Sequence, residues 1–335
     1  MKDLGIIVVN FNARDLLAAC LASVYQEQGV SYDVWVVDNV SDDGSASMVR
    51  ERFPLANVIE SPTNGGFAYG NNLALRAMGF TDVDEPVAMM VANPTSTPSS
   101  ILPRQGGGSE DDEHYHYILL LNPDTEVRPG DLRRSIDYMD AHRDIGVLGA
   151  KLVKADGSLD LACRRSFPTP GVAFYRMIGL SKLFPHSRRF GRYNLTYLDP
   201  DETAEIDAVA GAFMLVRPQV IRQVGLLDER FFMYGEDLDW ALRMKSAGWK
   251  VVYYPEVVVL HHKGGSSTTN RVRVISAFYQ SMLLFYDKHY SGGAFFLVRW
   301  LIVGAIVAQG ALAYLRHAVG LLTGLGRRRH SVERP

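Results

Sequence analysis

The chain has 335 residues, 47% hydrophobic and 21% charged, which is enough apolar material to bury a sizeable core and excludes wholesale disorder. Because 35 Lys and Arg residues nearly balance 37 Asp and Glu residues, the charge gives little support to nucleic-acid binding. The two cysteines, Cys20 and Cys163, lack metal-ligand spacing and are expected to be reduced thiols. The first apolar run is too short for a signal peptide, so we expect this part of the chain to stay in the cytosol.

Apolar strands alternate with helical segments through the first half of the chain. Strands are expected at 4–9, 33–38, 57–60 and 117–121, and helices at 13–28, through Val49 and Phe53, and at 71–78. This alternation predicts an α/β fold, with a mostly parallel central sheet and helices on both faces. Ligands of such sheets bind at the carboxyl ends of the strands, and the polar motifs of this chain follow its predicted strands.

The second half continues this pattern after one interruption. Helices are expected at 131–142 and within 228–247, and strands at 146–151, 207–217, 250–254 and 257–260. The stretch 81–116 is rich in Pro, Ser, Thr and Gly, and we expect a loop insertion without chemistry there.

The end of the chain changes character. Residues 295–315 are almost wholly apolar, and a basic cluster follows at 327–329. A spanning helix needs about 20 apolar residues, so a span, an interfacial helix, a re-entrant hairpin and a packed helical pair all stay open. The basic end suits anionic lipid on the cytoplasmic side. We therefore predict a membrane-associating helical region at 271–335, after a domain of residues 1–270.

Carboxylates follow two predicted strands of the sheet. Asp38 ends the second strand, and Asp124 lies just after the fourth, in the sequence NPDT with Asn122. Parallel strands bring these side chains to one crevice, and oxygen ligands of this kind suit Mg²⁺ or Mn²⁺ together with a substrate phosphate. The alternative is that each aspartate caps a helix or a turn.

Glycine-rich and asparagine-rich sequence surrounds these strands. Asn39 opens a polar turn, and Asn64, Gly65 and Asn71 belong to NGGFAYGNN, whose glycines let a ligand approach the backbone. The segment matches neither the G-x-G-x-x-G nor the P-loop pattern, which disfavours a dinucleotide oxidoreductase or a P-loop NTPase.

A second polar group lies late in the chain. Glu236 and Asp237 stand with Asp239 near a helix start, among aromatic residues, where acids also favour the helix dipole. A carboxylate held beside an acceptor hydroxyl can act as a general base. His261 and His262 end an apolar strand before a glycine-rich loop, and either histidine could ligate a metal.

Seven motifs occur in the order seen in family 2 glycosyltransferases of the GT-A fold: VVNFN, VVDNVSDDGS, NGGFAYGNN, LLLNPDT, GAFMLVR, ERFFMYGEDLDW and HHKGGSS. The chain resembles the rhamnosyltransferase-type branch of that family over about residues 4–270. The resemblance implies that Asp38 contacts the nucleobase and that Asn10 and Asn12 lie beside the nucleoside. Asn39, Asn64, Gly65, Asn71 and Asn122 complete the predicted nucleotide-sugar site.

The resemblance also implies a metal and a base. Asp124 matches the last residue of the DXD element, in which Asn122 replaces the first acid. His261 fits the metal or diphosphate histidine, with His262 as the alternative. Asp237, beside Glu236, matches the acid that acts as general base. The stretch 81–116 departs from the family, whose corresponding link is short.

The resemblance implies an inverting, metal-dependent hexosyltransferase whose donor is a nucleotide-diphosphate sugar. Within that class, the resemblance favours dTDP-rhamnose as the donor. We expect a polyprenyl-linked or polysaccharide acceptor of envelope glycan synthesis, at the cytoplasmic face of the plasma (inner) membrane. A homo-oligomer stays open, and no nucleic-acid partner is expected. The alternatives are a non-catalytic nucleotide-sugar-binding scaffold subunit and a two-carboxylate hydrolase. A transporter is disfavoured because a single terminal region is apolar enough.

Overall fold

The computed structural model describes residues 1–83, 114–262, 271–291 and 296–330. The chain divides into two compact units, one of residues 1–229 and 236–266 and the other of residues 230–235 and 267–335. Most of the insertion predicted at 81–116, and the glycine-rich loop after His262, lie outside the described residues.

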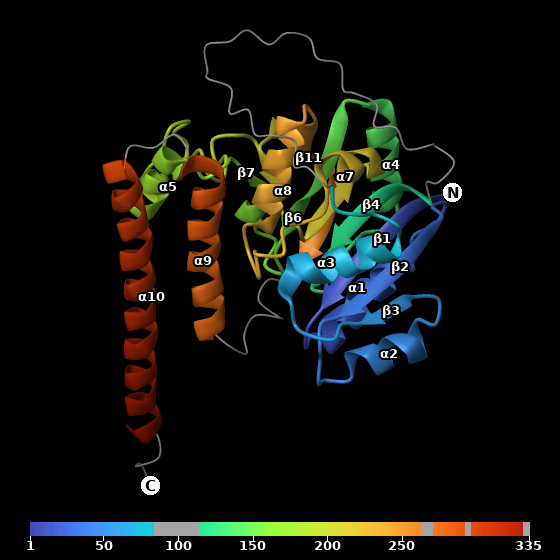
Figure 1. The fold of residues 1–335 in the computed structure, drawn as a ribbon. Helices are drawn as coiled ribbons and strands as arrows, with labels where there is room; N and C mark the ends of the chain where they lie inside the picture. Colours follow the sequence, from blue (N-terminus) through green and yellow to red (C-terminus); the bar gives the residue numbers. More distant parts are fainter. Residues whose placement is uncertain (84–113, 263–270, 292–295, 331–335) are drawn as a thin grey trace. The chain divides into compact units, whose positions relative to one another are not determined.

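Parallel strands form the first half of the larger unit (Figure 1). They run in the order β3-β2-β1-β4, with bounds β1 (Lys2–Asn10), β2 (Tyr32–Asp38), β3 (Asn57–Glu60) and β4 (Tyr115–Leu121). The Val, Ile and Leu side chains of β1, β2 and β4 are buried, as expected of strands covered on both faces, whereas those of the edge strand β3 are partly buried. The register sets Asn10 opposite Asp38, so the last residues of β1 and β2 meet at one edge of the sheet.

Helices connect these strands as predicted, with bounds α1 (Arg14–Val24), α2 (Ser45–Arg52) and α3 (Gly66–Ala77). α1 and α2 pack on one another, and α3 packs on β1 and β2. Gly70 allows that packing, because a Cβ at this position would lie 2.6 Å from Cγ1 of Val9. α3 begins five residues before the predicted helix start, so it contains most of the glycine-rich motif.

The second half of the sheet mixes strand directions. Its strands are β5 (Thr125–Glu126), β6 (Ile145–Val153), β8 (Ala204–Ile206), β10 (Phe213–Val216) and β11 (Lys250–His261). β10 is antiparallel to both β4 and β6, and β11 is parallel to β6. The fold is the predicted α/β architecture with a mostly parallel sheet, and the antiparallel strand at its centre was not foreseen.

Two predicted strand assignments need correction. The segment 207–217 forms two strands, because β9 (Ala208–Val209) pairs with β7 (Arg164–Arg165) in a separate small sheet, whereas β10 joins the central sheet. The segments 250–254 and 257–260 form the single strand β11, with a register shift between Tyr254 and Val258.

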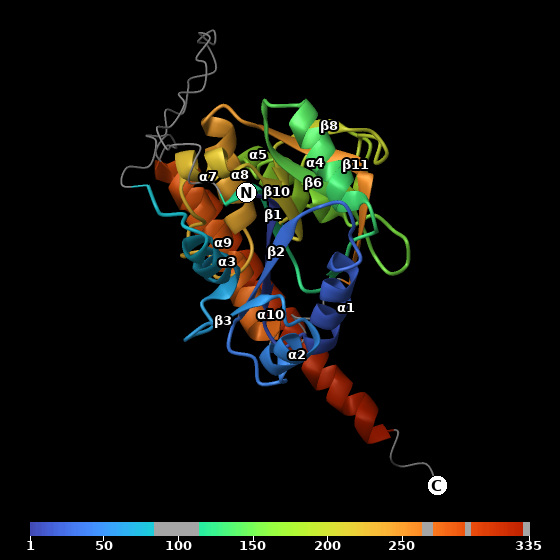
Figure 2. The ribbon, with the colours of Figure 1, turned by 90° about the vertical axis from the view of Figure 1, so that its right-hand side faces the viewer.

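The other helices of the larger unit are α4 (Asp131–Ala141), α5 (Pro170–Met177), α6 (Leu180–Leu183), α7 (Pro218–Val224) and α8 (Glu236–Ser246). α4 packs on β6 and β11, and α8 packs on α7, β9 and β11. Turning the view shows the central strands between α1 and α2 at one end and α4 at the other (Figure 2).

The smaller unit contains two long helices, α9 (Arg271–Tyr290) and α10 (Phe296–His330), which pack on each other. Among the described residues, one helix is long and apolar enough to cross a membrane, over Arg299–Val319, with mean hydropathy 1.4 and 11% of that window buried. Its Trp300 and Leu301 are 59% and 73% exposed. α10 is continuous, so the chain does not reverse direction within it.

Candidate active site

Polar side chains at the ends of β1 and β2 form one hydrogen-bonded group. Asn10 Nδ2 donates to Asp38 Oδ1 (3.2 Å) and to Ser41 Oγ (3.1 Å), and the Ser41 amide donates to Asp38 Oδ2 (2.9 Å). Asn12 adopts a positive φ of 49°, and its Oδ1 accepts from the Asp42 amide. Asn10 Oδ1 is buried without a hydrogen-bond partner in the described part of the chain. The predicted nucleoside residues Asn10, Asn12 and Asp38 are therefore brought together.

A second group joins the turn after β2 to the start of α3. Asn39 Nδ2 donates to Asn64 Oδ1 (3.3 Å) and to the Gly66 carbonyl (3.1 Å). The other amide atom, Asn39 Oδ1, is buried and has no hydrogen-bond partner among the described residues. An unsatisfied buried acceptor costs free energy, so this oxygen is a candidate for a ligand hydrogen bond.

The other two residues of the glycine-rich motif have local roles. A Cβ at Gly65 would lie 2.4 Å from the Tyr69 ring, so glycine is required where the chain enters α3. Asn71 is buried, and its Nδ2 donates to the Phe67 carbonyl (2.9 Å) within α3. This side-chain hydrogen bond of Asn71 thus stays within its own helix.

The turn after β4 places the predicted metal residues. The carbonyl of Asn122 accepts from Thr125, and its amide donates to the Ala212 carbonyl (3.1 Å). Asp124 is 4% exposed, and its carbonyl accepts from the His262 amide (2.8 Å). The end of β11 is thereby held beside the NPDT turn.

The imidazole of His261 lies between two aspartates. Its Nε2 is 3.4 Å from Asp124 Oδ1, and its Nδ1 is 3.0 Å from Asp160 Oδ2. Burial lowers the pKa of His261, but the carboxylates of Asp124 and Asp160 that face its two ring nitrogens outweigh burial and raise that pKa to about 9. Sequence reasoning missed Asp160, which lies in a turn 101 residues from His261.

This arrangement fits a divalent cation with few protein ligands. Asp124 Oδ1 is buried without a hydrogen-bond partner in residues the structure describes, and the Nε2 of His261 faces it. A histidine whose other nitrogen is held by a carboxylate, as Asp160 holds His261, is the usual arrangement at metal sites. No group of three His, Cys, Asp or Glu side chains suited to a metal occurs in the described ranges. His262 instead contacts Glu126 (2.6 Å), which favours His261 of the two histidines.

The carboxylate of Asp237 is held at the start of α8. Its Oδ2 ion-pairs with Arg165 (2.5 Å) and accepts from the Gly211 amide (3.2 Å), while Oδ1 accepts from the Leu238 amide. Arg165 also donates to the Val209 carbonyl (2.7 Å). Burial lowers the pKa of Arg165, but Asp237 outweighs burial and raises it, so the guanidinium stays charged. Sequence reasoning assigned no role to Arg165, although its segment carries two adjacent arginines.

Glu236 differs from its neighbour. It is 7% exposed, and its Oε2 has no hydrogen-bond partner within the described chain. Burial first, and then the charge of Asp237, raise the pKa of Glu236 to about 8. At neutral pH the buried Glu236 is therefore mostly protonated and uncharged.

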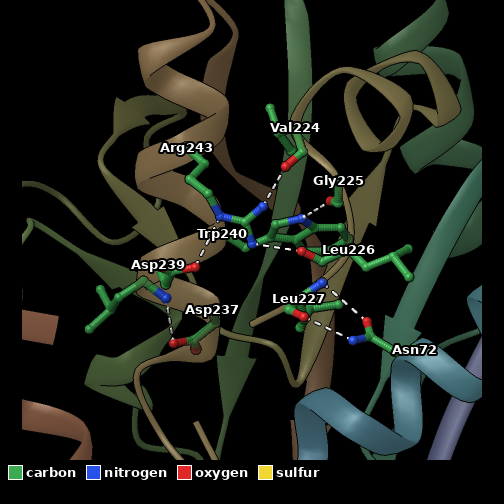
Figure 3. A network of polar contacts seen from close by, with 10 residues as sticks. Asn72, Val224, Gly225, Leu226, Leu227, Asp237, Asp239, Trp240 and Arg243 are labelled. Carbon is green, nitrogen blue, oxygen red and sulfur yellow. Dashed lines mark hydrogen bonds and ion pairs between the residues drawn. The ribbon is translucent and has the colours of Figure 1, made fainter. Parts of the chain in front are cut away.

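The third acid of the cluster serves the fold (Figure 3). Asp239 is fully buried and ion-pairs with Arg243 (3.0 Å), which also donates to carbonyl oxygens of the segment 224–227. Trp240 Nε1 donates to the same segment, and Asn72 of α3 exchanges two hydrogen bonds with it. These bonds fix the position of α8 and hence of the Asp237 carboxylate in its first turn.

One backbone bend links the two carboxylate groups. Within residues 210–212, the Gly211 amide donates to Asp237 and the Ala212 carbonyl accepts from Asn122. A Cβ at Gly211 would lie 3.0 Å from the Phe67 ring of the glycine-rich motif. The bend thus holds the NPDT turn, the start of α8 and the start of α3 close together.

The chain is similar in sequence to known glycosyltransferases. The family model described as glycosyltransferase like family 2 matches residues 2–277. The chain is 26% identical, over 92% of each chain, to N-acetylglucosaminyl-diphospho-decaprenol L-rhamnosyltransferase of Mycobacterium tuberculosis. It is 32% identical to the rhamnosyltransferase WbbL of Escherichia coli over 41% of this chain and 48% of that one.

A solved structure shares the fold. The mannosyltransferase PcManGT from Pyrobaculum calidifontis, in complex with GDP-Man and Mn²⁺, aligns with a TM-score of 0.53 at 15% identity. The alignment covers 98% of this chain and 82% of that one.

Proposed function

Because the chain belongs to the family 2 glycosyltransferases, we propose that it transfers L-rhamnose from dTDP-rhamnose to a polyprenyl-linked or polysaccharide acceptor. Two similar proteins bear the name of rhamnosyltransferases, and the name of one includes a diphospho-decaprenol. The observation that carries the proposal is the Asp237 carboxylate, fixed by Arg165 and by the same bend that holds the NPDT turn.

The base in this reaction is Asp237. It accepts the proton of the acceptor hydroxyl as the acceptor oxygen bonds to the anomeric carbon and the bond to the donor diphosphate breaks. A single displacement of this kind inverts the anomeric centre. Arg165 pairs with the carboxylate and orients it, and the protonated Glu236 adds no second negative charge beside it.

Asp124 and His261 would hold the divalent cation, Mg²⁺ or Mn²⁺, with donor phosphate oxygens as further ligands. The support is the unpartnered Asp124 Oδ1, the facing Nε2 of His261 and the Mn²⁺ of the mannosyltransferase with the same fold. The cation, when bound, stabilises the charge that grows on the leaving diphosphate.

The donor nucleoside would lie against Asn10, Asn12 and Asp38. Asn39 would also contact it, because the buried Oδ1 of Asn39 has no hydrogen-bond partner among the described residues. Residues 1–270 would form the catalytic domain and residues 271–335 the membrane-associating region, through the apolar window Arg299–Val319. The protein would act at the cytoplasmic face of the plasma membrane, where a polyprenyl-linked acceptor is held.

The test measures nucleoside-diphosphate release from a panel of nucleotide sugars with Mn²⁺ or Mg²⁺, with membrane extract as acceptor. We expect release from dTDP-rhamnose, and a kcat about 10²–10⁴-fold lower in Asp237→Asn, because the general base is lost. Glu51→Gln is the matched control, since Glu51 is an exposed carboxyl on α2. Donor binding without release in wild type would instead support the scaffold alternative, and equal release by Asp237→Asn would remove the assigned base.

A further inference from the structure

The segment 170–192, which contains α5 and α6, exposes large apolar side chains. Phe174, Ile178, Leu183 and Phe184 are 53%, 53%, 68% and 47% exposed. Large exposed apolar side chains gathered on one short segment are typical of an interaction site. α5 buries Val172 alone, and α6 buries no residue, so these helices contribute little to the core.

Local sequence explains why these side chains face outward. Thr169 caps α5 by accepting from the Val172 amide (3.4 Å), and Pro170 occupies the first helical turn. Phe174 and Ile178 are four residues apart, so they share one face of α5. Gly179, at φ 83°, ends this helix and begins α6, which presents the next apolar pair.

The same segment is strongly basic. No Asp or Glu occurs between Asp160 and Asp199, whereas segment 170–192 carries five exposed cations: Arg176, Lys182, Arg188, Arg189 and Arg192. None of them pairs with a carboxylate in the described part of the chain. Two of these cations hydrogen-bond to neutral side chains: Arg176 donates to Asn194 Oδ1 (2.7 Å), and Arg189 donates to the Tyr175 hydroxyl. Their charges are therefore uncompensated on a chain whose net charge is −2.

We propose that residues 170–192 seat the protein on the surface of an anionic lipid bilayer. Aromatic and aliphatic side chains that alternate with uncompensated cations are the composition of interfacial segments, in which the apolar groups enter the acyl boundary and the cations bind lipid phosphates. The absence of any acid over this stretch gives the charge complementarity that an anionic lipid surface requires. This surface is separate in sequence from the apolar window of α10.

The segment 170–192 follows the candidate active site closely along the chain. Pro170 follows Arg165 by five residues, so at most about 18 Å of chain separates the start of α5 from the cation that holds Asp237. The Ser166 amide bonds to the Tyr193 carbonyl (2.8 Å), which ties the two ends of the segment together beside β7. The idea that segment 170–192 brings the base near a lipid-linked acceptor rests on the proposed function. The bilayer contact itself does not.

A fluorescent probe on the full-length protein tests this contact. Cys20 and Cys163 are buried, so Leu183→Cys provides a single accessible thiol for a polarity-sensitive dye. Leu55→Cys, at a position 80% exposed, is the matched control. No nucleotide sugar is present, so failure of the proposed transfer reaction would leave this result unchanged.

With vesicles that contain phosphatidylglycerol, we expect a blue shift at position 183 and none at position 55. Replacing Lys182 and Arg188 by Gln should raise the vesicle concentration for half-maximal shift by roughly fivefold per cation removed. The absence of a shift at position 183, an equal shift at position 55, or an equal shift with neutral phosphatidylcholine vesicles would each overturn the proposal.

Discussion

Two buried carboxylates flank the bend at 210–212, and their electrostatic surroundings are opposite. Asp237 has a permanent cation, Arg165, and a backbone amide as partners. Asp124 has no Lys or Arg partner among the described residues, and its Oδ1 faces the imidazole of His261. Arg165 and a backbone amide hold the Asp237 carboxylate in place, whereas Asp124 Oδ1, which makes no hydrogen bond among the described residues, has an oxygen left for a cation. The difference is consistent with the proposed roles of Asp237 as base and Asp124 as metal ligand.

Removing the cation of Asp237 is the strongest test of this contrast. We expect Arg165→Met to lower the free energy of unfolding by about 3–5 kcal/mol, because it leaves a buried charge without its partner. Urea denaturation monitored by tryptophan fluorescence measures it. Arg189→Met, at an exposed position, should change stability by less than about 0.5 kcal/mol.

An equal loss of stability in Arg165→Met and Arg189→Met would contradict the contrast between Asp237 and Asp124. The double variant Arg165→Met/Asp237→Leu should regain part of the stability lost by Arg165→Met, because the uncompensated charge is then gone.

Neutralising the other carboxylate should act on the metal and leave folding nearly intact. We expect Asp124→Asn to weaken Mn²⁺ binding in the presence of nucleoside diphosphate by at least about 100-fold, since a ligand is lost. Electron paramagnetic resonance of free Mn²⁺ measures binding without any turnover. Unchanged Mn²⁺ affinity would show that the cation binds elsewhere, and Asp137→Asn on the exposed face of α4 is the control.

The smallest expected effect concerns the proton on Glu236. Its pKa is about 8 in the folded protein against an ordinary value of 4.5, so the folded state binds more protons than the unfolded state between these values. The resulting stability is complete below pH 4.5 and is lost as the pH rises through 8. From pH 5 to 6.5 this loss is about 2 kcal/mol, at about 1.4 kcal/mol per pH unit.

Urea denaturation between pH 5 and 6.5 should show the free energy of unfolding falling with this slope in wild type and with a flatter slope in Glu236→Gln. The range stops at 6.5 because the raised pKa of His261 adds a slope of the same sign above its ordinary value. Identical slopes in both proteins would mean that Glu236 holds no proton in the folded state.

Local pattern in the sequence determined most of the first half of this protein. Continuous apolar runs such as Ile6–Val9 indicate buried parallel strands, because strands covered on both faces need no polar alternation. The rule that ligands bind beyond strand ends then located Asp38 and Asp124. The ordered motifs identified the family, which the family match to residues 2–277 confirms.

The tertiary structure alone decided which groups meet. Arg165 reaches Asp237 across 72 residues and Asp160 reaches His261 across 101, and no local period encodes such contacts. The segment 207–217 is predicted from the sequence as one strand with a glycine bend, yet Gly211 divides it between two sheets, since pairing partners rather than propensity set the strand ends. The sequence thus determined the residue types, the buried parallel strands and the family, and packing determined the partners of each carboxylate.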